Sequence, residues 1–501
     1  MSTKKILFFI TMTGIVLVLQ GVISVYYNDQ EDTEGRTITH RELSIIQGDD
    51  LTDWLRWLYI LDPGTPLWTQ NDHLKNHVSS FRALGEPLRL VAVAPLTFVD
   101  VKNDAADCAC SGTSTANKEA TKVPNYLENT FVDPVQSQRR KNMLKECQTL
   151  GKNYAGTLPE PQMKRHMIYD VKTNLVFCDI PKVGSTFLKQ VLHIVYGHRH
   201  VKDPFSIKAS AAHTIPFNTF VSIPYDKALA VLMNSTKFMF VRHPYTRMLS
   251  GYVDKLYTNN FVFWGSHGKT ILKNHRQHVS KQSRECGHDS TFPEFIKHVI
   301  KSEISGTNRN PHWYPMYDAC RPCSLQYDVI GKIETFKEDI EKILRRQHLD
   351  EIIDISKMNE GNENEAISLT VNRAYDVIIH KPKCVSLPQA LERAWKVLQI
   401  RGVLSHLSDF PYNMIKKNSN ITKSSFKDFI VKEMKRLPMT KSDKDLSREQ
   451  AVVVAYESVP SGDLEKFNSI FHPDFTLYGY EKNIGTKHKN FLKWEPFKLR
   501  L

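Results

Sequence analysis

The chain has 501 residues, of which 41% are hydrophobic and 24% charged. This length allows one large or two ordinary domains, and the apolar fraction is sufficient for a sizeable core. The net charge of +13 favours polyanionic partners such as glycosaminoglycans, nucleotides, nucleic acids or membrane headgroups. We expect no nucleic-acid partner, because the chain carries no zinc-finger, RNP or helix-turn-helix signature.

Residues 6–27 form an apolar run that is long enough to span a bilayer as one helix. Two lysines precede the run and acidic residues follow it, so the positive-inside rule places residues 1–5 in the cytoplasm and the remaining chain in a lumen. A cleaved signal peptide is the alternative. The length of the run and the lack of a small-x-small cleavage site favour an uncleaved anchor. The sequence therefore predicts a single-pass type II membrane protein.

The segment 28–160 is predicted to be a lumenal stem. It starts acidic, continues through a tryptophan-containing apolar cluster at 54–60, and includes a Ser/Thr/Ala-rich run at 105–122. A catalytic domain is expected over 161–482, with a polar insertion at about 350–440, and 483–501 are expected to form a C-terminal tail.

Residues 175–196 predict a buried strand, a tight loop and a helix. The apolar run 175–180 forms the strand, and the helix is indicated by helical spacing of Leu188, Val191, Leu192 and Val195. The loop between them consists of Pro181, Lys182, Val183, Gly184, Ser185 and Thr186. Backbone N–H groups at such a helix start bind phosphate or sulfate. The loop is not a nucleoside-triphosphate P-loop, because the lysine precedes the only glycine.

A second strand, turn and helix follow at 237–256. The strand ends in Arg242, His243 and Pro244 begin the turn, and an amphipathic helix is marked by Met248, Leu249, Tyr252, Val253 and Leu256. Proline suits the first turn of such a helix. Arg242 and Ser250 are the right residue types to hold a second phosphate.

Two further blocks lie at 310–335 and 471–480. Together with the two strand–loop–helix units, these blocks resemble, in the same order, the membrane-bound Golgi carbohydrate sulfotransferases of the HNK-1, chondroitin and dermatan group. The resemblance extends over residues 169–480. It implies an α/β fold with a P-loop-like strand-loop-helix and a mostly parallel sheet, preceded by one transmembrane helix. It also implies a Golgi membrane location with a lumenal catalytic domain.

The resemblance assigns a donor site for 3′-phosphoadenosine 5′-phosphosulfate (PAPS), without a metal. The 5′-phosphosulfate would be bound by the loop residues, namely Pro181, Lys182, Val183, Gly184, Ser185, Thr186 and Phe187. The 3′-phosphate would be bound at Arg242, His243, Pro244 and Ser250. In the family the residue after the arginine is usually acidic, so His243 is a departure that affects substrate choice or pH response.

A base must take the proton from the acceptor hydroxyl, and a histidine titrating near neutral pH suits this role. The first candidate is His213, which lies between the two phosphate motifs as in some related glycosaminoglycan sulfotransferases. His312 is the alternative. Lys182 would stabilise the charge that develops on the leaving phosphate oxygen.

The resemblance predicts transfer of a sulfuryl group from PAPS to a glycan hydroxyl. The acceptor stays open between chondroitin or dermatan GalNAc, terminal GalNAc and the glucuronate of an HNK-1-type epitope. A non-catalytic lumenal glycan-binding protein is the alternative function. A nucleotide kinase is a third, but the chain lacks the Walker glycine-lysine pattern.

The eight cysteines are consistent with an oxidising lumen. We expect disulfides that involve Cys286, Cys320, Cys323 and Cys384, since the single Cys-x-x-Cys pair has no partner pair for zinc. Cys178 lies in the predicted central strand and is expected to be a buried thiol.

Three local features complete the expectations. Thr335 and Glu338 have the spacing of a helix capping box. The lysines of the insertion form either a solvated surface or a glycan-binding wall. Glycosylation sequons occur at Asn234 and Asn420, and Asn234 is expected to be the less accessible one.

Overall fold

The computed structural model describes residues 133–151, 164–417 and 421–499. The predicted cytoplasmic tail, the span 6–27 and nearly all of the predicted stem lie outside these ranges, as does Asn420. Among the described residues, none of the helices combines the length and the apolar character that crossing a bilayer requires.

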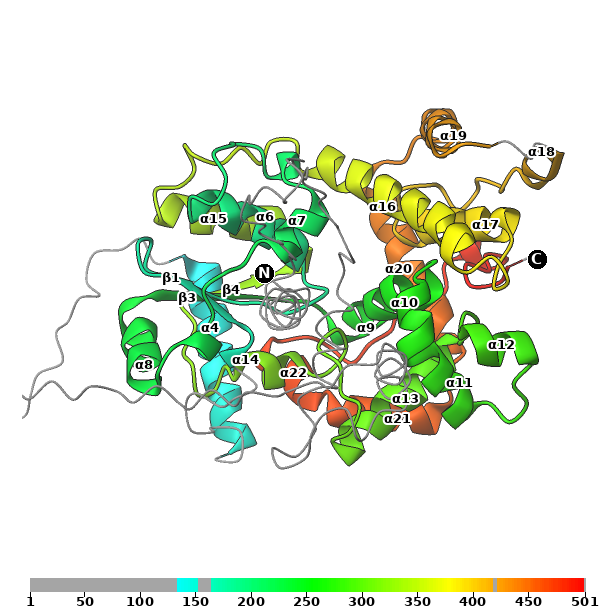
Figure 1. Ribbon diagram of the computed structural model, residues 1–501. Coiled ribbons are helices and arrows are strands. Elements are labelled where there is room, and N and C mark those ends of the chain that lie inside the picture. Colours follow the sequence, from blue (N-terminus) through cyan, green and yellow to red (C-terminus); the bar gives the residue numbers. More distant parts are fainter. Residues whose placement is uncertain (1–132, 152–163, 418–420, 500–501) are drawn as a thin grey trace, which may run out of the picture. The chain divides into compact units, whose positions relative to one another are not determined.

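A sheet of four strands in the described part of the chain confirms the α/β class (Figure 1). The strands stand in the order β1 (Met167–Asp170), β2 (Leu175–Cys178), β3 (Thr236–Val241) and β4 (Val329–Lys332). β1 is antiparallel to β2, whereas β2, β3 and β4 run parallel, so the sheet is mostly parallel as predicted. The register sets Phe177 beside Phe238, whose rings stack with centroids 5.0 Å apart.

The parallel strands deliver their C-terminal ends to one edge of the sheet, where ligands bind in open α/β sheets. The predicted loop follows β2 at this edge, Arg242 follows β3, and the segment that contains Glu334 follows β4. Three segments far apart in sequence therefore meet there.

Helices cover both sides of the sheet. In Figure 1, α6 (Ser185–Val195) and α15 (Phe336–Arg346) lie above the sheet, and α8 (Tyr225–Asn234) and α14 (Met316–Cys320) lie below it. The predicted apolar faces of α6 and α15 are packed into the core, with Leu188, Val191, Leu192, Ile340, Ile343 and Leu344 buried. Asn234, at the end of α8, is exposed.

The predicted capping box at the start of α15 is wrong. Thr335 makes no cap to the helix backbone. Its hydroxyl instead donates to the Asp339 carboxylate at 2.6 Å, which also accepts from the Lys332 backbone N–H at 2.9 Å. Asp339 thereby ties the end of β4 to the first turn of α15.

Helix α4 (Pro134–Leu150) packs along β4, although it falls in the range predicted as stem. Gln136 accepts from the Ile330 N–H at 2.9 Å, and Arg139 donates to the Ile330 carbonyl at 2.7 Å and to Asp339 at 2.8 Å. These bonds satisfy the free edge of β4. The packed domain therefore includes residues on the N-terminal side of 161.

The rest of the domain is helical. Its helices are α7 (Ala209–Thr214), α9 (Pro244–Tyr252), the π-helix η4 (Val253–Tyr257), α10 (Phe261–Phe263), the π-helix η5 (Trp264–Gly268), α11 (Lys269–His275), α12 (Lys281–Cys286), α13 (Phe292–Ser305), α16 (Met358–His380), α17 (Leu387–Ile400), α18 (Tyr412–Lys417), α19 (Lys423–Arg436), α20 (Lys441–Glu457), α21 (Ser461–Ile470) and α22 (His472–Leu477). Short 3₁₀ turns are η2 (Pro204–Ser206), η3 (Phe220–Ser222), η6 (Ile333–Thr335) and η7 (Lys489–Phe491).

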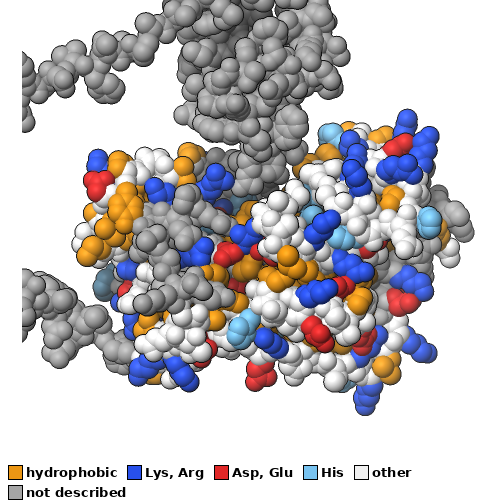
Figure 2. Space-filling model, turned by 90° about the horizontal axis from the view of Figure 1, so that it is seen from below, with side chains coloured by type: hydrophobic (Ala, Val, Ile, Leu, Met, Phe, Trp, Pro, Cys, Tyr) orange, Lys and Arg blue, Asp and Glu red, His pale blue; other side chains and the backbone are white. Residues whose placement is uncertain are grey.

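The region 350–440 is not a loose insertion. Helices α16 and α17 pack against each other, and the fully buried Trp395 of α17 anchors a hydrophobic cluster there. On α19, Lys432, Lys435 and Arg436 are exposed. On the face shown in Figure 2, Lys and Arg side chains are spread among acidic ones rather than gathered in one patch. Near the C-terminus, Phe491 and Trp494 are buried in a hydrophobic cluster with residues of α9, α13 and α20. This part of the predicted tail therefore packs on the domain.

Three disulfides join described segments, namely Cys147–Cys323, Cys178–Cys320 and Cys286–Cys384. The four cysteines that we expected to form disulfides all do so. The prediction of a Cys178 thiol is wrong, because the last residue of α14 comes within 5.9 Å of Cys178 between Cα atoms. Burial alone does not distinguish a thiol from a disulfide.

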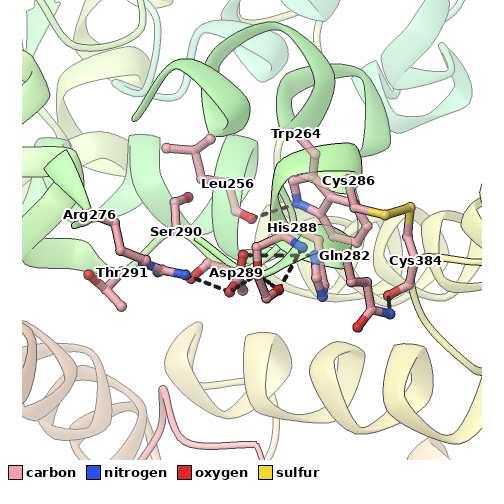
Figure 3. A network of polar contacts seen from close by, with 12 residues as sticks. Leu256, Trp264, Arg276, Gln282, Cys286, His288, Asp289, Ser290, Thr291 and Cys384 are labelled. Carbon is pink, nitrogen blue, oxygen red and sulfur yellow. Dashed lines mark hydrogen bonds and ion pairs between the residues drawn. A yellow bond between two sulfur atoms is a disulfide. The ribbon is translucent and has the colours of Figure 1, made fainter. Parts of the chain in front are cut away.

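Figure 3 shows how the third disulfide is supported. Cys286 ends α12 and Cys384 precedes α17, and the Gln282 amide donates to the Cys384 carbonyl at 3.1 Å. Nearby, Arg276 pairs with Asp289 at 2.7 Å. The disulfide therefore fixes the start of α17 to the helices that follow η5.

The disulfide pattern gives a first testable prediction. Peptide mapping without reduction should find the three cross-linked pairs and no free Cys178. The variant Cys147→Ser should lose about 2–5 kcal/mol of unfolding free energy, measured by denaturant titration, since its disulfide closes a very long loop. A free Cys178 thiol, or a Cys147→Ser variant as stable as the wild type, would contradict this connectivity.

Candidate functional site

The loop after β2 is shaped by two residues with positive φ, Lys182 at 72° and Gly184 at 83°. Gly184 is the N-cap of α6, and a Cβ at this position would come within 2.8 Å of the Phe336 ring. Glycine is therefore required there for both conformation and space. The loop delivers the first N–H groups of α6, from Ser185 onward, which is the arrangement that binds anions.

Lys182 is held by a buried carboxylate. Its ammonium lies 2.7 Å from Asp254 Oδ2. Burial lowers the pKa of Lys182 to about 8, against the opposing effect of Asp254. Lys182 is thus a cation at neutral pH that loses its proton more readily than an ordinary lysine.

Asp254 lies in η4 and is surrounded by cations. Besides Lys182, it pairs with Arg373 at 2.9 Å, Arg401 at 3.3 Å and Lys255 at 3.9 Å. Burial raises the pKa of Asp254, but the charges of these neighbours outweigh burial and hold that pKa well below its usual range. Asp254, Arg373 and Arg401 were not among the predicted site residues, because no local pattern connects three residues that are so far apart along the chain.

Arg242 meets the loop from β3. Its Nη1 donates to the Lys182 carbonyl at 3.3 Å and its Nε to Thr246 Oγ1 at 3.0 Å. Burial lowers the pKa of Arg242 to about 10, while Glu334 opposes this shift. The two predicted phosphate motifs are therefore brought together. Ser250 lies half-buried on α9, roughly two turns along from Arg242.

His243 caps α9. Its Nδ1 accepts from the Tyr245 N–H at 3.3 Å and its Nε2 donates to the Glu481 carbonyl at 2.9 Å. Burial lowers the pKa of His243, which keeps the ring neutral and its Nδ1 an acceptor. An acidic residue would also cap a helix here, so the departure from the family pattern preserves this structural role.

The carboxylate that acts on Arg242 is Glu334, which follows β4, and not a residue next to Arg242 in the sequence. Glu334 accepts from the His243 backbone N–H at 3.1 Å and from the Tyr480 hydroxyl at 2.9 Å. It lies in the block 327–335 that the sequence analysis singled out, but spacing gave no reason to pair it with Arg242.

Arg247 joins the loop to the block at 310–323. The side chain is 1% exposed and donates to the carbonyls of Pro181 at 3.1 Å, Pro311 at 3.1 Å and Tyr314 at 2.7 Å. A planar guanidinium supplies several donors in fixed directions, as three separate carbonyls require. Arg247 is therefore a positioning residue for the loop.

His213, the first candidate base, is an exposed residue of α7 beside the loop. Its Nδ1 lies 3.4 Å from Lys189 Nζ and its Nε2 lies 3.1 Å from Thr186 Oγ1. An ammonium can only donate, so the neutral ring accepts at Nδ1 and carries its proton on Nε2. The lone pair of neutral His213 is thus engaged by Lys189 in this arrangement.

His312, the alternative base, is half-buried. Its Nδ1 lies 2.7 Å from Asn310 Oδ1, so Nδ1 carries the proton and Nε2 carries the lone pair. Burial, and then the charges of Lys255 and Lys182, lower the pKa of His312 well below its usual range. His312 is therefore a neutral imidazole close to the Lys182 ammonium. Among the described residues, no cluster of three or more His, Cys, Asp or Glu side chains is placed to hold a metal ion.

The chain is similar in sequence to known proteins. Residues 165–370 match the sequence model of the sulfotransferase family. Carbohydrate sulfotransferase 11 of Rattus norvegicus is 30% identical over 188 residues, which cover 37% of this chain and 53% of that protein. Carbohydrate sulfotransferase 14 of Danio rerio is 28% identical over 236 residues, covering 47% of this chain and 61% of that protein.

A third relative, carbohydrate sulfotransferase 8 of Mus musculus, is 24% identical over 299 residues, covering 57% of this chain and 68% of that protein. The chain spans about half the length of the first of these relatives. No solved structure matches the chain.

The role of Arg247 gives a second prediction. Arg247→Met keeps a long side chain but leaves three carbonyls without their donors, so unfolding free energy should fall by at least about 3 kcal/mol. The control Arg284→Met removes an exposed arginine that bonds one carbonyl, and it should change stability by less than about 0.5 kcal/mol. Thermal and denaturant unfolding measure both. Equal stability of the two variants would refute the positioning role.

Proposed function

We propose that this protein transfers a sulfuryl group from PAPS to a hydroxyl group of a glycan, because residues 165–370 match the sequence model of the sulfotransferase family. The single observation that carries the proposal is that Arg242, which follows β3, binds the backbone carbonyl of Lys182 in the loop that starts α6, so that two partly buried cationic residues lie at one edge of the sheet. The relatives, named carbohydrate sulfotransferases, support a glycan as the acceptor.

The residues at this edge of the sheet fit the donor. PAPS is anionic at both ends, with a phosphosulfate on one side and a 3′-phosphate on the other. The N–H groups at the start of α6, together with Lys182, suit the first group, and Arg242 with Ser250 suits the second. Both cations are partly buried, so water screens their charges less than it would on the open surface.

The mechanism follows from charge and alignment. When bound, PAPS supplies the sulfuryl group; the acceptor oxygen forms a bond to sulfur while the bond from sulfur to the phosphate oxygen breaks. Lys182 stabilises the negative charge that develops on that leaving oxygen. The backbone N–H groups of residues 183–187 hold the 5′-phosphate, and Arg242 and Ser250 hold the 3′-phosphate, so that the donor is aligned with the acceptor.

A histidine takes the proton of the acceptor hydroxyl. We assign this step to His312 rather than to His213, for two reasons. His312 has its lone pair on Nε2 and lies close to Lys182, whereas Lys189 engages the lone pair of His213. A base with a lowered pKa is weaker, but it stays deprotonated through the pH range of the lumen.

The acceptor sugar and the cellular location belong to the same proposal. The acceptor is the GalNAc of chondroitin or dermatan, a terminal GalNAc, or the glucuronate of an HNK-1-type epitope. The protein acts in the Golgi lumen, anchored as a single-pass type II protein by residues 6–27. The three disulfides support an oxidising compartment.

The third prediction tests the activity itself. Full-length protein with radiolabelled PAPS should label at least one glycan in a panel of chondroitin, dermatan and HNK-1-type acceptors. Lys182→Ala should lower turnover by about 10²–10³ while PAPS affinity changes much less, because Lys182 acts mainly on transition-state charge. The control Lys342→Ala removes a surface lysine paired with Asp133 and should leave both values unchanged. Glycan binding with no transfer would instead support a non-catalytic lumenal glycan-binding protein.

The fourth prediction separates the two candidate bases by pH. A base works when it is deprotonated, and the lowered pKa of His312 keeps it so as pH falls through 6.5. Turnover should therefore stay level between about pH 7 and 6 and should fall above pH 8, where Lys182 loses its proton. His312→Ala should lower turnover by about 10²–10⁴, and His213→Ala far less. A loss of rate on the acidic side that is present in the wild type and absent in His213→Ala would assign the base to His213.

A further inference from the structure

The π-helix η4 directly follows α9 and carries the carboxylate that holds Lys182. All five of its residues, Val253–Tyr257, are buried. π-Helical turns are rare and occur mostly where a helix must present side chains at a functional site. Here the turn buries an aspartate and a lysine side by side, at the edge of the proposed donor site.

The two oxygens of the Asp254 carboxylate have different partners. Oδ1 accepts from Arg373 at 2.9 Å and from Arg401 at 3.3 Å. Arg373 also donates to the Asp254 backbone carbonyl at 3.0 Å, so one arginine fixes both the side chain and the main chain. Oδ2 is left to accept from Lys182 at 2.7 Å.

We propose that Asp254 is a positioning residue that holds the Lys182 ammonium in a resting position and releases it to the donor, while Arg373 and Arg401 keep the carboxylate oriented and ionised. This inference rests on the proposed function for the identity of the donor. It assigns a role to a residue outside both predicted phosphate motifs.

The charge balance explains why Lys182 can leave. Four cations lie within 4 Å of the single Asp254 carboxylate. When Lys182 turns to an incoming anion, Asp254 keeps Arg373, Arg401 and Lys255, so no buried charge is left unpaired. A carboxylate paired with Lys182 alone would lose its only partner, and that would oppose the movement.

Both arginines, Arg373 and Arg401, lie on the C-terminal side of the matched region 165–370 in the sequence. Arg373 belongs to α16 and Arg401 follows α17. A third arginine, Arg393 within α17, donates to the Tyr257 carbonyl at 2.8 Å and so fixes the C-terminal end of η4. The region first interpreted as a polar insertion thus builds the support of Lys182.

The charged groups facing Lys182 determine how its pKa responds to substitution. They are Asp254 and Lys255 from η4, Arg373 from α16, Arg401 after α17, His312 from the block at 310–323, and Arg242 after β3. Burial has the largest effect on the Lys182 pKa; Asp254 raises the pKa, whereas Lys255 and Arg401 lower it. Asp254→Asn should therefore lower the Lys182 pKa, and Arg401→Gln should raise it.

The experiment measures this pKa directly in the full-length protein without donor. The Lys182 side chain is 17% exposed, so a small acylating reagent such as acetic anhydride can reach it. Peptide mass spectrometry reports acetylation of Lys182 against pH, and the wild-type midpoint should lie near pH 8. We expect Asp254→Asn to lower the midpoint by about one unit or more, a tenfold change in the amine-to-ammonium ratio, and Arg401→Gln to raise it.

Asp376→Asn is the matched control, because it removes a carboxylate of α16 that pairs with Lys423 at the surface. Its Lys182 midpoint should equal that of the wild type. With PAPS and acceptor, Asp254→Asn should lower kcat at pH 7.5 and recover as the pH is lowered, while affinity for adenosine 3′,5′-bisphosphate is retained. A merely structural role would weaken nucleotide binding without moving the midpoint.

The inference is overturned if Asp254→Asn and Arg401→Gln both keep the wild-type midpoint. Thermal melts would reveal whether Asp254→Asn folds. If it does not, the Lys182 acetylation midpoint of Arg401→Gln alone tests the inference, and an unchanged midpoint overturns it. A wild-type protein that transfers no sulfate would refute the proposed function, whereas the labelling midpoints would still decide the role of Asp254.

Discussion

The buried carboxylate of Asp254 is the constraint on which the proposed site depends. It gathers cations from the loop after β2, from α16 and from the end of α17, and so holds three distant segments at one point. Buried cations without a carboxylate among them would repel one another and lose protons. With Asp254 present, the cluster stays charged while its positive charge exceeds its negative charge, which is the state that an anionic donor requires.

Around this cluster, hydrogen bonds to backbone groups maintain the geometry. Arg247 donates to backbone carbonyls of the loop and of the block at 310–323, and His243 caps α9 as a neutral ring. The carboxylate that acts on Lys182 is Asp254, and the one that acts on Arg242 is Glu334. The site is thus rigid in its backbone and remains electrostatically attractive to anions.

The local pattern of the chain predicted the two strand–loop–helix units because each is defined by near neighbours. Strand β2 and helix α6 follow from apolar spacing, and the loop between them follows from one lysine and one glycine. Local pattern failed where several groups compete for one partner. The Thr335 hydroxyl bonds the Asp339 carboxylate, four residues ahead, instead of capping α15, and Lys332 at the end of β4 and Arg139 of α4 bond the same carboxylate.

The sequence by itself determined the α/β class, the resemblance to sulfotransferases and the position of the proposed donor loop, since periodicity and motif order are properties of short segments. Only the tertiary structure decided the Cys178–Cys320 disulfide, the neighbours of Arg242 and the role of 350–440. Each of these depends on which residues meet across the sheet edge. Pairing between residues that lie far apart along the chain is set by the packing of the whole domain, and a single sequence carries no local signal of it.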